Sequence, residues 1–296
     1  MSHVLLNKTE PPFGPIVNGT QIVFFEYRPN EGAAWTFVVL FGLSAIVHLG
    51  LLGWLRAWHF LPLTLGVVGE AFGYYGRVQA HSEPNIAGPF IMQNILILGT
   101  APLIAATVYM TLGRYIRVFQ IRDRIVIPPR LMTVFFITVD LGCFVTQVFG
   151  SAAPASGDPK GIALGRTLII SGLIVQLVAL GLFLIITSVS HRLVRTIRAD
   201  YKMTGMLSAS RYFQATYMVG GAMMVRSLVR GIEYLQGEGG YIISHEVFIY
   251  ALDAAPMVFV AAVYVFIHPG KLLWDAKQQK GESERLEMSD YERLTH

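Results

Sequence analysis

The stretch RTLIISGLIVQLVALGLFLIITS, residues 166–188, decides what class of protein this is. After Arg166 it contains no charged residue, and Gln176 carries its only long polar side chain. An α-helix needs about 20 predominantly apolar residues to cross the ~30 Å hydrocarbon core of a bilayer. The stretch therefore predicts a transmembrane helix.

Six further stretches have the same apolar character and are separated by charged or Gly/Pro/Ser-rich connectors. The seven predicted spans are residues 34–53, 59–77, 90–112, 131–150, 166–188, 212–233 and 247–267. The chain of 296 residues is 53% hydrophobic and only 14% charged, whereas soluble domains have about 25% charged residues. We therefore predict an all-α polytopic membrane protein, with a seven-helix domain over residues 34–270, an N-terminal segment over residues 1–33 and a polar tail over residues 271–296.

Lysine and arginine are concentrated in the third connector, the fifth connector and the C-terminal tail. These regions lie on one side of the membrane only if the N-terminus is outside. Because short basic loops stay in the cytosol, we predict an extracellular or lumenal N-terminus and a cytosolic C-terminus. This orientation would make the sequon at Asn18 available for glycosylation. The basic character of the chain follows from this asymmetry, so it does not indicate a nucleic-acid partner.

The sequence lacks the motifs of several kinds of functional site. The single cysteine excludes a disulfide framework within the chain and a cysteine-based zinc site. No two histidines have the H-x-x-x-H spacing that would begin a metal site on one helical face, and no G-x-x-x-x-G-K-[ST] phosphate loop is present. We therefore expect no metal, no cofactor and no enzymatic activity.

Charged and polar residues nevertheless recur at helical spacing inside the apolar stretches. The candidates for a ligand or transport path are Glu70, Tyr74, Arg77, Gln93, Asn94, Tyr109, Asp140, Gln147, Gln176, Arg226, Arg230, Glu233, Glu246, Tyr250 and Asp253. An ionised side chain at the centre of a bilayer costs roughly 2.5–3.5 kcal/mol on insertion scales, so several are tolerated together only if they face one another. We predict one inward-facing polar cluster, displaced toward the outer side of the membrane.

The predicted cluster contains three arginines and five acids, so the acids cannot all be paired one to one. At least one acid is therefore a candidate for binding a cation or a proton, or for exposure to water at the rim. We predict that Arg230 pairs with Asp253 or Glu246. Glu70 is the first choice for the acid that receives a cationic ligand, because glycines flank it and allow close helix approach. The alternative is that these ion pairs only fix helix packing.

The sequence GEAFGYYGR, residues 69–77, resembles the E-x-x-G-Y-x-x-R signature of the fungal lipid-translocating exporter family, also called RTA-like proteins. Further matches are Gln93-Asn94 with Ala101-Pro102 and Tyr109, Asp140 with Gln147 and Gly150, Gly172-Leu173 with Gln176, Arg226 with Arg230, Glu233 and Gly237, Glu246 with Tyr250, Asp253, Pro256 and Met257, and His268-Pro269-Gly270. The resemblance covers residues 34–270. It implies seven transmembrane helices in a fungal plasma or internal membrane, resistance to toxic amphiphiles, and translocation of sphingoid bases, with porphyrin or haem handling in related members.

Three functions remain open at this point. The first is a transporter or translocase of lipids or toxic amphiphiles, with the plasma membrane as the expected location and an internal membrane as the alternative, and with membrane lipids and an amphiphilic small molecule as its partners. The second is a receptor-like sensor of lipid or stress, because seven helices with an outside N-terminus are also the layout of receptors. The third is an intramembrane lipid hydrolase, which the scattered histidines disfavour. The sequence does not predict an oligomeric state.

Overall fold

The computed structural model describes residues 10–17, 20–125, 127–152, 159–200, 206–237 and 239–275. The predicted glycosylation site Asn18 and the chain beyond residue 275 lie outside these residues. Glycosylation of Asn18 and the cytosolic tail therefore stay predictions, as does the division of the chain into three parts.

Each of the seven predicted spans coincides with a helix. The helices are α1 (Glu31–Trp54), α2 (Leu61–Ser82), α3 (Ala87–Val118), α4 (Pro129–Ala152), α5 (Pro159–Asp200), α6 (Met206–Gln236) and α7 (Ala255–Phe266). Short elements complete the described chain: the strands β1 (Ile16–Val17) and β2 (Thr20–Gln21), the 3₁₀ turns η1 (Trp58–Phe60) and η2 (Arg122–Arg124), and the π-helical segment η4 (Ile249–Ala254). The all-α class is confirmed.

The distribution of side chains is that of a protein in lipid. The outer surface of α5 is a continuous apolar stripe that includes Ile174, Val178, Leu182, Ile185 and Val189, while charged residues are buried inside the bundle. A soluble protein shows the opposite arrangement. Five segments, α1, α3, α4, α5 and η4–α7, are long and apolar enough to cross a bilayer by themselves. Since α2 and α6 are more polar, the count of seven crossings stays a prediction.

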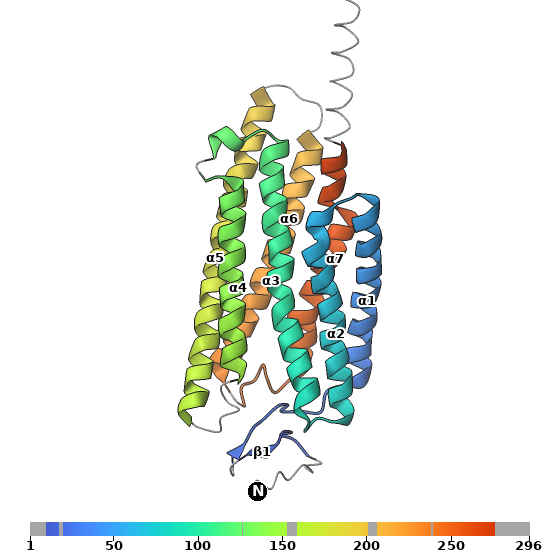
Figure 1. Ribbon diagram of the computed structural model, residues 1–296, viewed down its shortest axis with the longest axis vertical. Coiled ribbons are helices and arrows are strands. Elements are labelled where there is room, and N and C mark those ends of the chain that lie inside the picture. The colour runs from blue at the N-terminus through green and yellow to red at the C-terminus, as the bar shows by residue number, and fades with distance from the viewer. Residues whose placement is uncertain are drawn as a thin grey trace, which may run out of the picture.

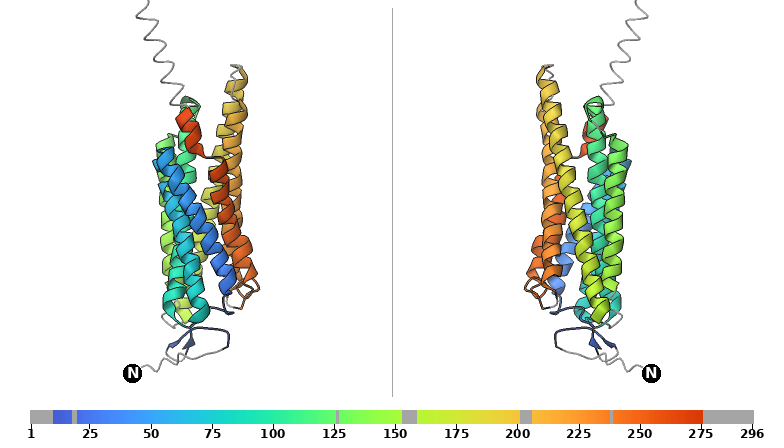
Figure 2. Two further views of the ribbon diagram at one scale, coloured as in Figure 1. Left: turned by 90° about the vertical axis from the view of Figure 1, so that its right-hand side faces the viewer. Right: turned by 90° about the vertical axis from the view of Figure 1, so that its left-hand side faces the viewer.

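Consecutive helices are neighbours, and α7 returns to pack on α1. Figure 2 shows α2, α3 and α4 on one side of the bundle and α6 and α7 on the other, with α1 and α5 running obliquely between them. The basic α3–α4 connector, the end of α5 and the start of α6 lie at one end of the bundle, opposite the strands β1 and β2 (Figure 1). This position agrees with the prediction that the basic regions share one side of the membrane. Which side faces the cytosol stays a prediction.

The described part of the N-terminal segment covers the other end of the bundle (Figure 1). Its strands β1 and β2 pair antiparallel. Phe13 and Phe25 form a small hydrophobic core with Ala80 of α2, and Phe24 stacks on Phe90 of α3 with ring centroids 4.6 Å apart. The segment is therefore packed onto the helix ends.

Glycines bring α2 unusually close to α3. A Cβ atom added at Gly73 would lie 2.8 Å from Cγ1 of Ile97, and one added at Gly76 would lie 3.1 Å from the carbonyl oxygen of Pro89. Small residues at such positions allow transmembrane helices to approach closely. The close contact fixes the depth at which Glu70 and Arg77 of α2 enter the bundle.

The last span is not a regular α-helix throughout. Residues Ile249–Ala254 form the π-helical segment η4, which leads into Pro256 near the start of α7. Because proline has no backbone N–H and its ring clashes with the carbonyl four residues earlier, a widened turn relieves the conflict. π-Helical turns of this kind are frequent at functional sites, and this one carries Tyr250 and Asp253.

Candidate functional site

Arg226 of α6 lies at the centre of the buried charges. Its Nη1 atom is 2.8 Å from Oε1 of Glu70, and its Nε atom is 2.9 Å from Oδ1 of Asp253. Its Nη2 atom also donates a hydrogen bond of 2.8 Å to the carbonyl oxygen of Ile97, and Thr100 donates one of 2.6 Å to Glu70. All three charged side chains are buried. Glu70, Arg226 and Asp253, termed the Arg226 cluster below, therefore join α2, α6 and η4 to each other.

Arg77 organises a second cluster nearer the N-terminal segment. Its Nη2 atom is 2.9 Å from Oε1 of Glu246 and donates a 2.8 Å hydrogen bond to the hydroxyl of Tyr27. The Nε atom donates to the hydroxyl of Tyr250 at 3.0 Å, and Nη1 donates to Oε1 of Gln93 at 3.4 Å. Burial raises the pKa of Tyr27 above its ordinary value even though Arg77 acts in the opposite direction, so the phenol stays neutral and accepts this bond at physiological pH.

The predicted pairing of Arg230 is wrong. Arg230 makes an ion pair of 3.0 Å with Glu233 on its own helix. Asp253 pairs with Arg226 and not with Arg230, and Glu246 forms its ion pair with Arg77. The reason is the depth of each arginine in the bundle. Arg226 lies level with Asp253, and Arg230 follows it on α6 by four residues, about one helical turn.

Asp140 of α4 is the acid that remains. Among the described residues no arginine or lysine forms an ion pair with it. Its Oδ2 atom accepts a 2.8 Å hydrogen bond from the hydroxyl of Tyr109, and its buried Oδ1 atom has no hydrogen-bond partner. The count of charges predicted at least one such acid. Glu70, the acid chosen from the sequence, is held by Arg226 and Thr100, but it shares the arginine with Asp253 and its Oε2 atom has no hydrogen-bond partner in the described part of the chain. Its role toward a ligand therefore stays a prediction.

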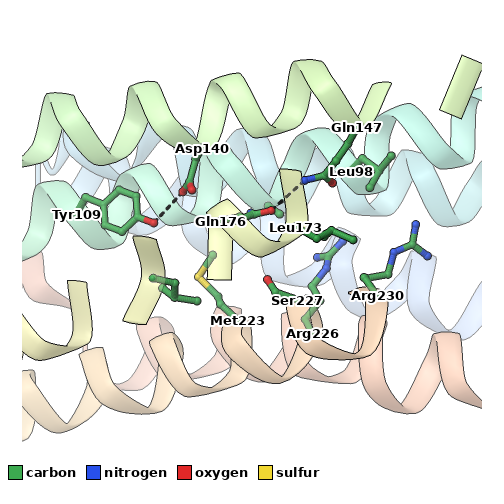
Figure 3. Close-up of a pocket in the computed structure, with 12 residues that line it drawn as sticks. Leu98, Tyr109, Asp140, Gln147, Leu173, Gln176, Met223, Arg226, Ser227 and Arg230 are labelled. Atoms are coloured by element: carbon green, nitrogen blue, oxygen red, sulfur yellow. Dashed lines mark hydrogen bonds between the residues drawn. The ribbon is translucent and has the colours of Figure 1, made fainter. Parts of the chain in front are cut away.

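Asp140 lines a small cavity, termed the Asp140 cavity (Figure 3). The residues around it are Leu98, Ala101, Tyr109, Asp140, Gln147, Leu173, Gln176, Leu180, Met223, Arg226, Ser227 and Arg230. Asp140 and Gln147 point from α4 toward α6, and Arg226 and Arg230 point from α6 toward them. Gln147 donates a 3.1 Å hydrogen bond to Gln176. The cavity has a volume of about 30 Å³, room for about two water molecules.

The structure thus joins nearly all the predicted site residues in one polar interior. Arg226 belongs to its own cluster and also lines the Asp140 cavity, and so it connects the two. Asn94 is half-buried and belongs to neither cluster nor to the cavity wall. Sequence reasoning missed Tyr27, Thr100 and Ser227. Thr100 and Ser227 lie within predicted spans and carry short side chains that give no signal of their own, and Tyr27 lies outside every span.

No group of three potential metal ligands lies close together in the part of the chain that the structure describes. The polar interior can therefore be understood from its carboxylates, guanidinium groups, amides and hydroxyls. These groups can bind a charged head group by hydrogen bonds and ion pairs, while Leu98, Leu173, Leu180 and Met223 offer apolar contacts.

Comparison with known proteins gives the family. Residues 63–276 match the family model described as RTA1 like protein. The protein is 36% identical over 210 residues to Protoporphyrin uptake protein 1 of Saccharomyces cerevisiae, an alignment that covers 69% of this chain and 67% of the relative. It is 34% identical over 214 residues to Protein RTM1 of the same species, with 70% and 66% covered.

A third relative is the Sphingoid long-chain base transporter RSB1 of Saccharomyces cerevisiae strain Lalvin EC1118, which is 24% identical over 276 residues, with 82% of this chain and 72% of the relative covered. No solved structure matches the chain significantly. The matched residues 63–276 include both charged clusters and the Asp140 cavity, except for Tyr27. The chain is therefore an integral membrane protein of the RTA1-like family.

Proposed function

We propose that this protein translocates lipid-like amphiphiles with a cationic head group across a membrane, and that sphingoid bases belong to its substrates. The observation that carries the proposal is Asp140. It is a carboxylate buried in the membrane interior, with one oxygen that has no partner and no arginine or lysine paired with it among the described residues. Ionisable groups at such depth mark substrate and ion paths by default.

The Asp140 cavity has the chemistry that a long-chain amine requires. The ammonium group would replace the missing partner of Asp140, while Gln147 and Gln176 offer amide oxygens to its remaining N–H groups. The apolar chain would lie against Leu173 and Met223. The name of the sphingoid base transporter among the relatives supports this substrate class.

The cavity of about 30 Å³ is far too small for such a substrate, since ligand sites are typically about 300–1,000 Å³. The structure therefore corresponds to a closed conformation in this proposal. Transport requires α4 and α5 to separate from α6, which would open the Asp140 cavity while the Arg226 cluster keeps α2, α6 and η4 together.

A second candidate is transport of a porphyrin, which carries carboxylates instead of an amine. It is favoured by the relative named for protoporphyrin uptake and by Arg226 and Arg230, which line the same cavity. Both arginines, however, already form ion pairs with acids, and only Nε of Arg230 among their buried nitrogens has no hydrogen-bond partner within the described residues. A porphyrin would have to displace Glu70 or Glu233, so the amine is the better fit.

The driving force in this proposal is a gradient or passive movement, since the sequence has no phosphate loop. We assign no enzymatic activity, and we propose the plasma membrane as the location. The sensor alternative predicts ligand-dependent signalling without net movement of lipid.

The test is a leaflet-access assay with purified protein in liposomes. Fluorescent sphingoid base, fluorescent phosphatidylcholine and protoporphyrin are each placed in one leaflet, and their appearance in the other is followed against empty liposomes. We expect the protein to accelerate movement of the sphingoid base at least tenfold and the phosphatidylcholine little. Acceleration of protoporphyrin alone would establish the second candidate, and acceleration of none would contradict transport.

A further inference from the structure

A second cavity lies on the outer surface of the bundle, between α5 and α6. It has a volume of about 350 Å³ and is lined by Leu184, Ile185, Ser188, Val189, Arg192 and Tyr217. Its volume falls in the range of about 300–1,000 Å³ that is typical of ligand sites. It shares no residue with the Asp140 cavity.

One end of this α5–α6 groove is apolar and opens toward lipid. Ile185 and Val189 are exposed and continue the apolar stripe on the outer surface of α5. Leu184 packs over Gly220 of α6, where an added Cβ atom would lie 2.6 Å from the leucine Cδ2 atom. The missing side chain at Gly220 lets α6 approach α5 closely, so that the two helices form the floor of the groove.

The other end of the groove is polar and positively charged. Arg192 follows Ser188 by four residues, so both lie on the same face of α5. Arg192 is exposed and has no ion-pair partner among the described residues. The hydroxyl of Tyr217 lies 3.3 Å from that of Ser188 and 3.5 Å from Nδ1 of His191, within hydrogen-bond distance of both.

We infer that the α5–α6 groove binds one phospholipid with an anionic head group. An acyl chain lies along Leu184, Ile185 and Val189, and the phosphate meets the guanidinium of Arg192 and the hydroxyl of Ser188. Arginine matches phosphate geometry through two parallel N–H donors. The groove lies toward the basic end of the bundle, which is the predicted cytosolic side, where anionic lipids are concentrated.

A lipid in this groove would contact α5 and α6 together. A bound lipid would therefore stabilise the contact between α5 and α6. This role does not depend on which substrate the Asp140 cavity takes.

The test is binding of lipids to the purified full chain in a neutral detergent, followed by native mass spectrometry. Phosphatidylserine and phosphatidylcholine with the same acyl chains are titrated against the wild type and Arg192→Gln. We expect Arg192→Gln to weaken phosphatidylserine binding about fivefold, the factor that corresponds to about 1 kcal/mol per arginine near an anionic surface. Phosphatidylcholine presents the same phosphate, but its choline group makes the head group neutral overall, so its binding should weaken by less than about twofold.

Two further variants make the test specific. Arg195→Gln removes an exposed arginine that does not line the groove and should change binding less than twofold. Val189→Phe fills the groove without changing charge and should weaken both lipids. Glycerophosphoserine, the head group without acyl chains, should compete poorly. Equal binding by Arg192→Gln and wild type, an equal loss in Arg195→Gln, or full competition by the head group alone would each overturn the proposed lipid site.

Discussion

The Arg226 cluster and the Asp140 cavity differ in how the charge of their carboxylates is balanced. In the Arg226 cluster, Glu70 and Asp253 share one arginine at 2.8 and 2.9 Å, and three separate helical segments are tied together. In the Asp140 cavity, the carboxylate has one hydrogen bond from Tyr109, and one of its oxygens has no partner. In the first arrangement each carboxylate has a guanidinium partner, although the two acids share it and Oε2 of Glu70 has no hydrogen-bond partner in the described chain. In the second, Asp140 has no arginine or lysine partner among the described residues.

The comparison separates structural charges from functional ones. A buried ion pair contributes little net stability when intact, but removal of one partner strands a charge and is strongly destabilising. Loss of an acid that has no cationic partner strands nothing. Substitutions in the Arg226 cluster should therefore affect folding first, and substitution of Asp140 should affect function alone.

The largest effect is expected from Arg226→Met. It leaves Glu70 and Asp253 buried without a cation, which should lower stability by about 3–5 kcal/mol and sharply reduce the yield of folded protein. The measurement is the thermal midpoint of the purified protein in detergent, with exposed Arg195→Gln as the control. Adding Glu70→Gln and Asp253→Asn to Arg226→Met should recover part of the loss. A midpoint for Arg226→Met equal to that of the control would show that the cluster is not structural.

A smaller effect is expected at the end covered by the N-terminal segment. Arg77→Gln removes the partner of Glu246, but that acid is partly exposed, with 19% of its side chain accessible, and also accepts a hydrogen bond from the backbone of Asn30. We therefore expect a loss of about 2 kcal/mol, and about 1.5 kcal/mol for Tyr27→Phe, which removes one hydrogen bond to a charged group. Proteolysis of the N-terminal segment should become faster in both variants. Unchanged proteolysis would mean that Arg77 does not hold this segment in place.

The smallest effect concerns the wall of the Asp140 cavity. The hydrogen bond between Gln147 and Gln176 should have a coupling free energy of about 0.6 kcal/mol, the average for such bonds between transmembrane helices. A double-mutant cycle with Gln147→Leu and Gln176→Leu measures it as a shift in thermal midpoint. A coupling above about 2 kcal/mol would make this pair as structural as the Arg226 cluster and would remove the contrast between the cluster and the cavity.

The helices could be predicted from the sequence because the lipid interior demands about 20 apolar residues in each span. Their ends could not, since α5 and α6 continue past the predicted spans into regions where polar residues are tolerated. Pro256 is the sequence feature that indicates an irregularity near η4. A proline predicts a disturbance of the helix, but it does not predict that the disturbance is a π-helical turn.

The members of the polar interior could be predicted from helical spacing, but their pairing could not. Arg226 and Arg230 lie on one face of the same helix, and only the relative depth of α6 and η4 decides which of them meets Asp253. The glycines around Glu70 predicted close helix approach, and this is confirmed, since a Cβ atom at Gly69 would lie 2.7 Å from Cγ2 of Thr100 of α3.

The central claim is that Asp140 serves a ligand and not the fold, and Asp140→Asn tests it most directly. Asparagine keeps the size of the side chain and can still accept the hydrogen bond from Tyr109. The variant is compared with the wild type and with Asp123→Asn, a control at an exposed position in η2, by thermal midpoint and by the leaflet-access assay with fluorescent sphingoid base. We predict that Asp140→Asn keeps the wild-type midpoint and moves the base at less than one tenth of the wild-type rate. A normal rate in well-folded Asp140→Asn would contradict the account.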